Sequence, residues 1–142
     1  MKVVFFTDRD LGLKFPRILR EAGVLVERHA DHFAPTAGDE EWLELTAKRK
    51  WVAITHDSRI RYKPNQLEAV IAHKAALFVV VGAAPFPELA HNFVATLPRV
   101  LAFIAEHERP YIAKVYRPMV AREKPSKSAM GQVSLWYPRT PS

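Results

Sequence analysis

The sequence predicts an α/β fold in which a mainly parallel sheet of five strands lies between two layers of helices. Three observations lead to this prediction. Five short apolar runs are rich in β-branched or aromatic residues and end at turn residues. The runs do not alternate polar and apolar positions, which is typical of strands buried on both faces. Helical patterns separate them, and an alternation of strand and helix builds a parallel sheet covered by helices.

The individual elements follow from local patterns. Strands are expected at residues 3–6, 24–26, 52–55, 77–81 and 111–116, and helices at residues 13–22, 40–50, 65–74 and 86–107. The first helix should end at Gly23, because glycine adopts the left-handed conformation that closes many helices. Pro98 should kink or divide the last helix, because proline has no backbone N–H to donate.

The length of 142 residues fits one domain, which we place at residues 1–116. Residues 117–142 contain five Lys or Arg residues against Glu123 alone, together with four prolines. We expect this segment to be an extended basic arm. Within it, residues 133–137 are apolar enough to pair as a short strand or to dock on a partner.

Composition excludes several classes of chemistry. The chain has no cysteine, so it has no disulfides, thiolate zinc sites, iron–sulfur clusters or cysteine nucleophiles. The 21 Lys and Arg residues exceed the 15 Asp and Glu residues, and the net charge of +6 favours a polyanionic partner. The first apolar run is too short for a signal peptide or a membrane span, so we expect a cytoplasmic protein with no membrane partner.

Acidic residues gather where ligands bind in such folds, which is at the carboxyl ends of parallel strands. They follow the first and third strands and open the helix that precedes the third strand. In chain order they are Asp8, Asp10, Asp39, Glu40, Glu41 and Asp57. Each has a simpler explanation as a helix cap or a turn residue. If they converge, their charges repel one another unless a cation neutralises them, and Mg²⁺ or Mn²⁺ fits carboxylate ligands.

Such an ion can activate a water molecule and position a phosphodiester for hydrolysis. Basic residues flank the acids, since Arg9 lies in the first acidic motif and Arg59, Arg61 and Lys63 follow Asp57. They could hold a nucleic-acid backbone. The alternative is an ordinary solvated charged loop. His29, Asp31 and His32 have a spacing that metal ligands can have, although a variable polar loop explains them as well.

Three segments, FFTDRDLG, GDEEWL and ITHDSRIRYKP, occur in this order and precede the apolar run FVVV. Together they resemble the PIN-like nuclease domains, particularly the toxin subunits of prokaryotic toxin–antitoxin pairs of the VapBC type, over residues 2–82. The resemblance implies one or two Mg²⁺ ions and ribonuclease activity. It also implies an antitoxin protein bound over the cleft, and homodimerisation through the helices.

By this resemblance, Asp8 and Asp57 match the strand-end metal ligands, and Asp39 matches the acid that begins the helix. Glu41 is the alternative to Asp39, and Asp10 is an accessory ligand. The sequence departs from many PIN domains where a fourth carboxylate is expected after the next strand, because Gly82, Ala83 and Ala84 stand there.

We therefore expect an Mg²⁺- or Mn²⁺-dependent endoribonuclease that acts as a toxin. Its catalytic residues are Asp8, Asp39, Asp57 and Glu41, its metal ligands are Asp8, Asp10, Asp39 and Asp57, and its RNA-binding residues are Arg9, Arg59, Arg61 and Lys63. Two alternatives stay open. One is a receiver-like domain with Asp57 as phosphoacceptor and Lys114 beside it. The other is a nucleic-acid-binding module without catalytic activity.

Overall fold

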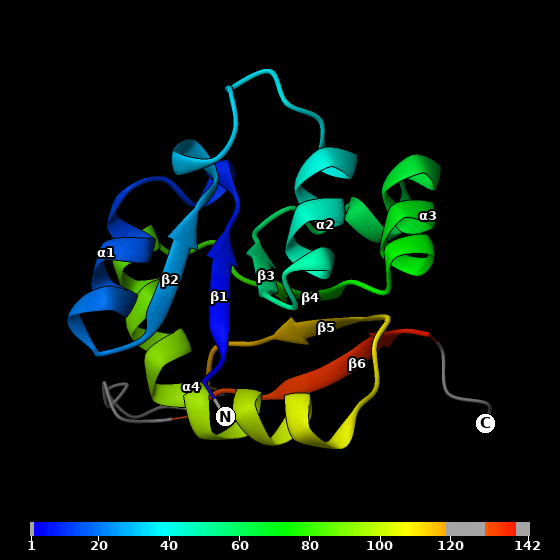
Figure 1. Ribbon diagram of the computed structural model, residues 1–142. Helices are drawn as coiled ribbons and strands as arrows, with labels where there is room; N and C mark the ends of the chain where they lie inside the picture. Colours follow the sequence, from blue (N-terminus) through cyan, green and yellow to red (C-terminus); the bar gives the residue numbers. More distant parts are fainter. Residues whose placement is uncertain (1, 119–129, 139–142) are drawn as a thin grey trace.

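The computed structural model describes residues 2–118 and 130–138, and within them a central sheet organises the chain (Figure 1). The sheet has six strands in the order β2-β1-β3-β4-β5-β6. The first five are parallel, and β6 is antiparallel to β5. The strands are β1 Val4–Thr7, β2 Leu25–Arg28, β3 Val52–Thr55, β4 Ala76–Val80, β5 Tyr111–Val115 and β6 Val133–Tyr137.

Helices cover both faces of this sheet. The α-helices are α1 Lys14–Glu21, α2 Asp39–Lys48, α3 Pro64–His73 and α4 Phe86–Glu106, and short 3₁₀ turns occur at η1 Arg9–Leu11, η2 His29–Asp31 and η3 Ile60–Tyr62. Helix α1 packs against α4, and α2 packs against α3. The prediction of a mainly parallel three-layer α/β fold is confirmed, with six strands in place of the expected five.

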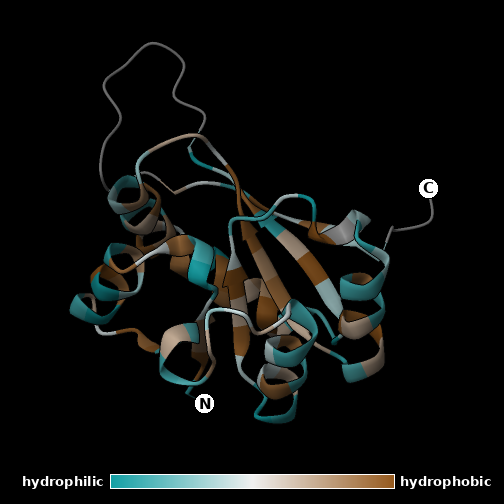
Figure 2. Ribbon diagram, turned by 90° about the horizontal axis from the view of Figure 1, so that it is seen from above, coloured by the Kyte–Doolittle hydropathy of each residue, from teal (hydrophilic) through white to brown (hydrophobic). Residues whose placement is uncertain are grey.

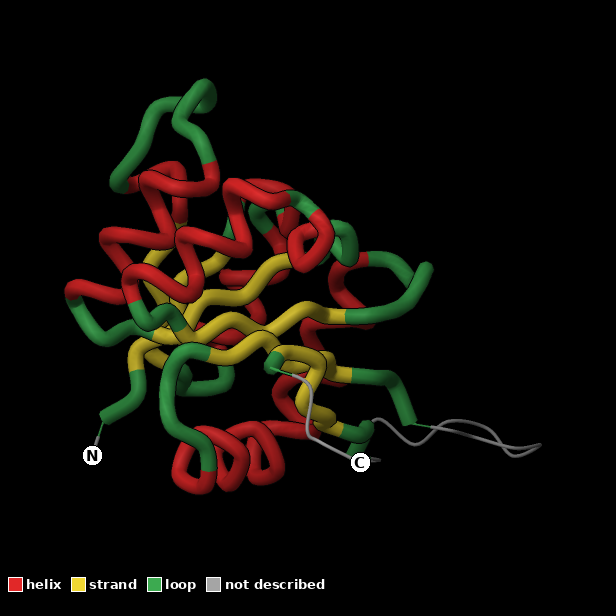
Figure 3. Tube along the Cα trace, turned by 90° about the vertical axis from the view of Figure 1, so that its right-hand side faces the viewer, coloured by secondary structure: helices red, strands yellow, loops and turns green. Residues whose placement is uncertain are grey.

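The two faces of the sheet form separate hydrophobic cores, because neighbouring side chains of a strand point in opposite directions. Phe5 packs edge-on against Phe93 of α4, with ring centroids 5.6 Å apart. Phe6, the next residue, stacks on Trp42 of α2 at 5.7 Å. The central strands are accordingly coloured largely as hydrophobic in Figure 2, and Figure 3 shows the sheet between its helical layers.

Helix α4 runs through Pro98 as one continuous helix, so the expected division does not occur. Its axis bends along its length (Figure 1), as a proline inside a helix requires. Pro98 has no backbone N–H to donate within α4, and the side chain of Thr96 adds a hydrogen bond in the turn before it. The hydroxyl of Thr96 donates to the carbonyl oxygen of Asn92 at 2.7 Å.

The sixth strand comes from the segment expected to be a basic arm. Of the two expectations for residues 133–137, pairing as a strand is the one confirmed. Gly131 precedes the strand, and a Cβ atom there would collide with the carbonyl oxygen of Tyr116, so only glycine fits. Arg99 and Thr96 of α4 hold Gly131 from the other side, by hydrogen bonds of 2.7 and 2.9 Å to its carbonyl oxygen and N–H.

The expected domain boundary after residue 116 stays a prediction. The remaining basic residues of the expected arm, which are Arg122, Lys124, Lys127 and Arg139, lie outside the described residues. Within residues 2–118 and 130–138, no helix is both long and apolar enough to cross a lipid bilayer.

Candidate active site

The order of the strands creates one position at which ligands commonly bind, between β1 and β3. The chain passes from β1 to β2 on one side and then crosses back to β3 on the other side of β1. In open α/β sheets, the crevice at such a reversal, beyond the carboxyl ends of the strands, is the usual binding site. Strand β1 ends at Thr7 and β3 at Thr55, so the acids that follow these two strands flank this crevice.

The hydroxyl of Thr55 lies at the centre of three of these acids. Its Oγ1 is 2.9 Å from Oδ2 of Asp8 and 3.2 Å from Oδ2 of Asp10. The backbone N–H of Asp57 donates to the same oxygen at 3.2 Å. Asp10 also accepts a 3.1 Å hydrogen bond from the N–H of His56. Residues 45 or more positions apart in the chain therefore meet at the ends of β1 and β3.

Sequence reasoning did not single out Thr55, and a polar residue closing an otherwise apolar strand was the signal that could have found it. Thr55 is fully buried. A buried hydroxyl needs a hydrogen-bond partner, and at a strand end the nearest polar groups are those of the ligand-binding edge.

The electrostatics of the cluster show that its negative charges oppose one another. Burial, together with the charges of Asp10 and Asp39, raises the pKa of Asp8 to about 7, against the hydrogen bond from Thr55. The pKa of Asp10 is also raised, by burial first and by the charge of Asp57. A cation bound at these carboxylates would favour their charged forms.

Helix α2 supplies two of the predicted acids, and they have different surroundings. Asp39 begins the helix, and its two oxygens accept hydrogen bonds from Nε1 of Trp42 at 3.0 Å and Nε2 of Gln66 at 3.4 Å. Glu41 is exposed, and its carboxylate accepts a 2.8 Å hydrogen bond from the N–H of Gly38, which caps the helix. Asp39 is thus the acid whose charge reaches Asp8, while Glu41 stabilises its own helix end.

Asp57 is joined to two of the predicted RNA-binding residues. Nζ of Lys63 lies 2.6 Å from its Oδ2. Arg59 donates to Oδ1 from its backbone at 2.9 Å and from Nε at 3.4 Å. Burial alone would raise the pKa of Asp57, but the hydrogen bonds and charge of Lys63 and Arg59 outweigh burial and lower it. Two of the expected RNA-binding cations therefore neutralise an acid of the site.

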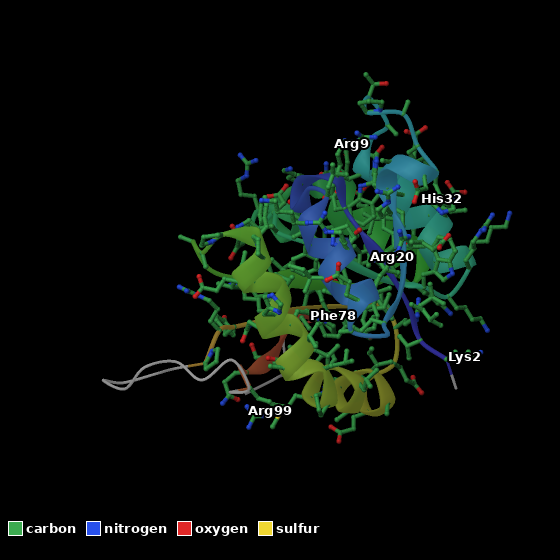
Figure 4. The ribbon with its side chains drawn as sticks, turned by 90° about the vertical axis from the view of Figure 1, so that its left-hand side faces the viewer. Lys2, Arg9, Arg20, His32, Phe78 and Arg99 are labelled. Atoms are coloured by element: carbon green, nitrogen blue, oxygen red, sulfur yellow. The ribbon has the colours of Figure 1, made fainter. Side chains whose placement is uncertain are left out.

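The other two predicted RNA-binding residues, Arg9 and Arg61, are not paired with Asp57 in the contacts that the structure describes. Arg9 is directed to the loop after β2. Its Nε lies 3.3 Å from Nδ1 of His29, and its Nη2 lies 3.3 Å from the carbonyl oxygen of Phe33. Figure 4 shows Arg9 beside this loop. Arg61 lies within η3, and its side chain is not among those that the structure describes.

The structure also locates the residues of two alternatives from the sequence. Among the described residues, His29, Asp31 and His32 do not form a group that could hold a metal ion, and they contact Arg9, Arg28 and Glu27 respectively. Lys114, the lysine of a receiver-like site, lies with its Nζ 3.9 Å from the ring centroid of Trp136 on β6.

The donor chemistry of the cluster fits Mg²⁺ or Mn²⁺, because carboxylate oxygens are hard ligands and Mg²⁺ needs only one or two of them beside its waters. Asp8 and Asp10 could supply these oxygens. In their present arrangement, the described residues contain no group of three or more His, Asp or Glu side chains placed to hold an ion. Asp57 could join Asp8 and Asp10 as a ligand only by giving up its ion pair with Lys63.

The expected fourth carboxylate is missing where β4 ends. Val81 and Gly82 follow this strand, and the ring of His56 approaches it instead. Nδ1 of His56 lies 2.7 Å from the carbonyl oxygen of Val80. His56 thus links the ends of β3 and β4 beside the acids.

Carboxylates thus lie at the topological reversal of the sheet in this three-layer α/β domain. A family model described as PIN-like domain matches residues 3–82, which is more than half of the chain. The protein therefore belongs to the PIN-like domain family. The matched segment contains β1 to β4 and the acids Asp8, Asp10, Asp39, Glu41 and Asp57. A comparison with curated proteins and one with solved structures found no match.

Proposed function

We propose that this protein is a metal-dependent endoribonuclease that hydrolyses RNA phosphodiesters at the ends of β1 and β3. One observation carries the proposal. The carboxylates of Asp8 and Asp10 meet at the hydroxyl of Thr55, at the reversal point of a PIN-like sheet, and the backbone N–H of Asp57 donates to the same hydroxyl oxygen. PIN-like domains are commonly nucleases, and the net charge of +6 suits an anionic substrate.

In this proposal Asp8 and Asp10 hold Mg²⁺ or Mn²⁺, Asp57 joins them after turning from Lys63, and Asp39 adds negative charge. A bound ion would supply Lewis acidity toward the phosphate and a more acidic water. Thr55 orients the two ligand carboxylates, because its buried hydroxyl lies within hydrogen-bonding distance of both. Lys63 and Arg59 would hold phosphates of the RNA once Asp57 turns from Lys63 to the ion.

The wider biological role is also a proposal. The resemblance to toxin subunits of toxin–antitoxin pairs supports a toxin that acts in the cytoplasm and is neutralised by an antitoxin protein bound over the acidic crevice. Homodimerisation belongs to the same proposal. A small partner protein that copurifies with this chain and blocks its ribonuclease activity would support the toxin assignment.

The direct test is RNA cleavage by the purified protein. We expect cleavage of single-stranded RNA with Mn²⁺ or Mg²⁺, none with EDTA, and a loss of at least about a hundredfold in Asp8→Asn and Asp10→Asn variants that remain folded. Glu68→Gln is the matched control, because Glu68 is an exposed acid on α3 outside the cluster. The proposal fails if RNA stays intact with both metals, or if both Asn variants cleave as fast as the control.

A second candidate is a nucleic-acid-binding module without catalytic activity. The pairing of Asp57 with Lys63 favours it, since a lysine already neutralises one of the acids. Such a module would bind RNA with a steep salt dependence and leave it uncut in every metal. The same assay, run beside a binding measurement, separates the two candidates.

A further inference from the structure

A cluster of two aromatic rings and a lysine lies at the β6 edge of the sheet. Tyr62 of η3 and Trp136 of β6 meet edge to face, with ring centroids 5.7 Å apart and an interplanar angle of 79°. Nζ of Lys114 on β5 lies 3.9 Å from the centroid of the Trp136 ring. We name these three residues the aromatic platform. It joins three elements that are distant in sequence.

The members of the platform differ in exposure. Trp136 is partly buried and packs against the core formed by α2 and α3. Tyr62, in contrast, is 68% exposed. Its contact with Trp136 orders the ring, so little conformational entropy would be lost when a ligand stacks on it. Single-stranded nucleic acids stack their bases on exposed aromatic rings in positively charged grooves, and Lys114, which lies against Trp136, supplies one cation of the platform.

The platform is continuous with the acidic site. Lys63 follows Tyr62 directly, and its Nζ lies 2.6 Å from Asp57. Arg59, three residues before Tyr62, has a side chain that is 79% exposed. A path of cations therefore leads from the aromatic ring to the acids, as a phosphate backbone would require.

We propose that the aromatic platform stacks a nucleobase of single-stranded RNA, and that the adjoining backbone passes Arg59 and Lys63 toward Asp57. This proposal rests on the proposed function, because it takes RNA as the substrate. A duplex is a poorer ligand for the platform, since its bases are already stacked on one another.

The test measures binding without cleavage. A fluorescently labelled single-stranded oligoribonucleotide is titrated with the full chain in EDTA, and its anisotropy gives Kd. We expect Tyr62→Ala to weaken binding about tenfold, because stacking on an aromatic residue contributes at about this level. Tyr62→Phe keeps the ring and should stay within about twofold of the wild type.

Two controls isolate stacking from folding and from charge. Leu25→Ala removes another exposed apolar side chain, 47% exposed, on the opposite edge strand, and should leave Kd unchanged. An abasic oligonucleotide of the same length keeps the phosphates and should bind the wild type and Tyr62→Ala equally. Circular dichroism verifies that each variant is folded.

Three results would overturn the proposal: equal Kd values for the wild type and Tyr62→Ala, an equal loss of affinity with the abasic strand, or no RNA binding by the wild type. Since metal is absent, the outcome is independent of hydrolysis. If RNA binds through Tyr62 but is never cut, the nuclease proposal fails and the stacking proposal stands.

Discussion

Nζ of Lys63 lies 2.6 Å from Oδ2 of Asp57, six residues earlier in the chain. This ion pair occupies a carboxylate that the proposed metal site would use. Lys63 and a divalent cation therefore compete for Asp57.

Replacing Lys63 should strengthen metal binding. We expect Lys63→Met to bind Mn²⁺ up to about fivefold more tightly than the wild type, since a partly exposed ion pair contributes up to about 1 kcal/mol. Isothermal titration calorimetry measures the affinity. Lys48→Met removes the same charge from an exposed position on α2 and is the control. Equal affinities in the two variants would show that Lys63 does not compete with the ion.

Thr55 should matter both for stability and for metal binding. Thr55→Val removes the buried hydroxyl that lies within hydrogen-bonding distance of Asp8 and Asp10 and accepts from the N–H of Asp57. We expect a loss of about 1–3 kcal/mol in the free energy of unfolding and weaker Mn²⁺ binding at pH 7.

Thr46→Val is the matched variant, because the buried hydroxyl of Thr46 donates to the carbonyl oxygen of Leu43 in the same helix, away from the acids. It should lose stability but keep the wild-type affinity for Mn²⁺. If Thr55→Val also kept that affinity, the hydroxyl would have no role in positioning the carboxylates.

The raised pKa of Asp8 predicts a pH-dependent stability in the absence of metal. The pKa of this group is about 7 in the folded protein and 3.8 in the unfolded chain, so between these values the folded state binds more protons. The free energy of unfolding should therefore fall as pH rises from about 4 to 7, by at most about 1.4 kcal/mol per pH unit for this one proton.

Urea denaturation in EDTA at several pH values measures this slope, and Asp8→Asn should flatten it. The pH dependence that Asp57 contributes has the opposite sign, because its pKa is lowered. Its contribution to the free energy of unfolding is lost only as the pH falls below about 4. A wild-type slope that equals the Asp8→Asn slope would show that Asp8 titrates normally.

Gly131→Ala should loosen β6. The added Cβ atom would collide with the carbonyl oxygen of Tyr116, and we expect a loss of about 3 kcal/mol in the free energy of unfolding. The backbone N–H of Tyr116, which donates to Gln132 at 2.8 Å, should exchange faster with deuterium. At Gly38 a Cβ atom meets nothing within 4 Å, so Gly38→Ala is the control. Similar losses in both variants would exclude this packing explanation.

The parts of the fold that were predictable are those with strong local patterns. The buried runs that became β1, β3 and β4 have no polar alternation, and the ends of β1 and β3 located Asp8 and Asp57 from the sequence alone. Parallel strands bring their carboxyl ends to one edge, so the presence of these two acids at the same edge follows from the fold class, whereas the direction of the Asp57 carboxylate does not.

The parts that were not predictable depend on contacts between distant residues. No local pattern tells that Lys63 turns back to Asp57 rather than outward to solvent. The choice between Asp39 and Glu41 depends on which side chain caps the helix, and three adjacent acids leave that open. Strand β6 is short, and its pairing depends on the fit of Gly131 against Tyr116, which only the folded chain shows.

The most direct test of the proposed metal site is a crystal of the protein soaked in Mn²⁺ and measured at a wavelength where manganese scatters anomalously. We predict a peak bound by carboxylate oxygens of Asp8 and Asp10, with Asp57 turned from Lys63 toward it. Anomalous maps with no peak at the ends of β1 and β3, in crystals that bind Mn²⁺ elsewhere or not at all, would contradict a shared ion at this site.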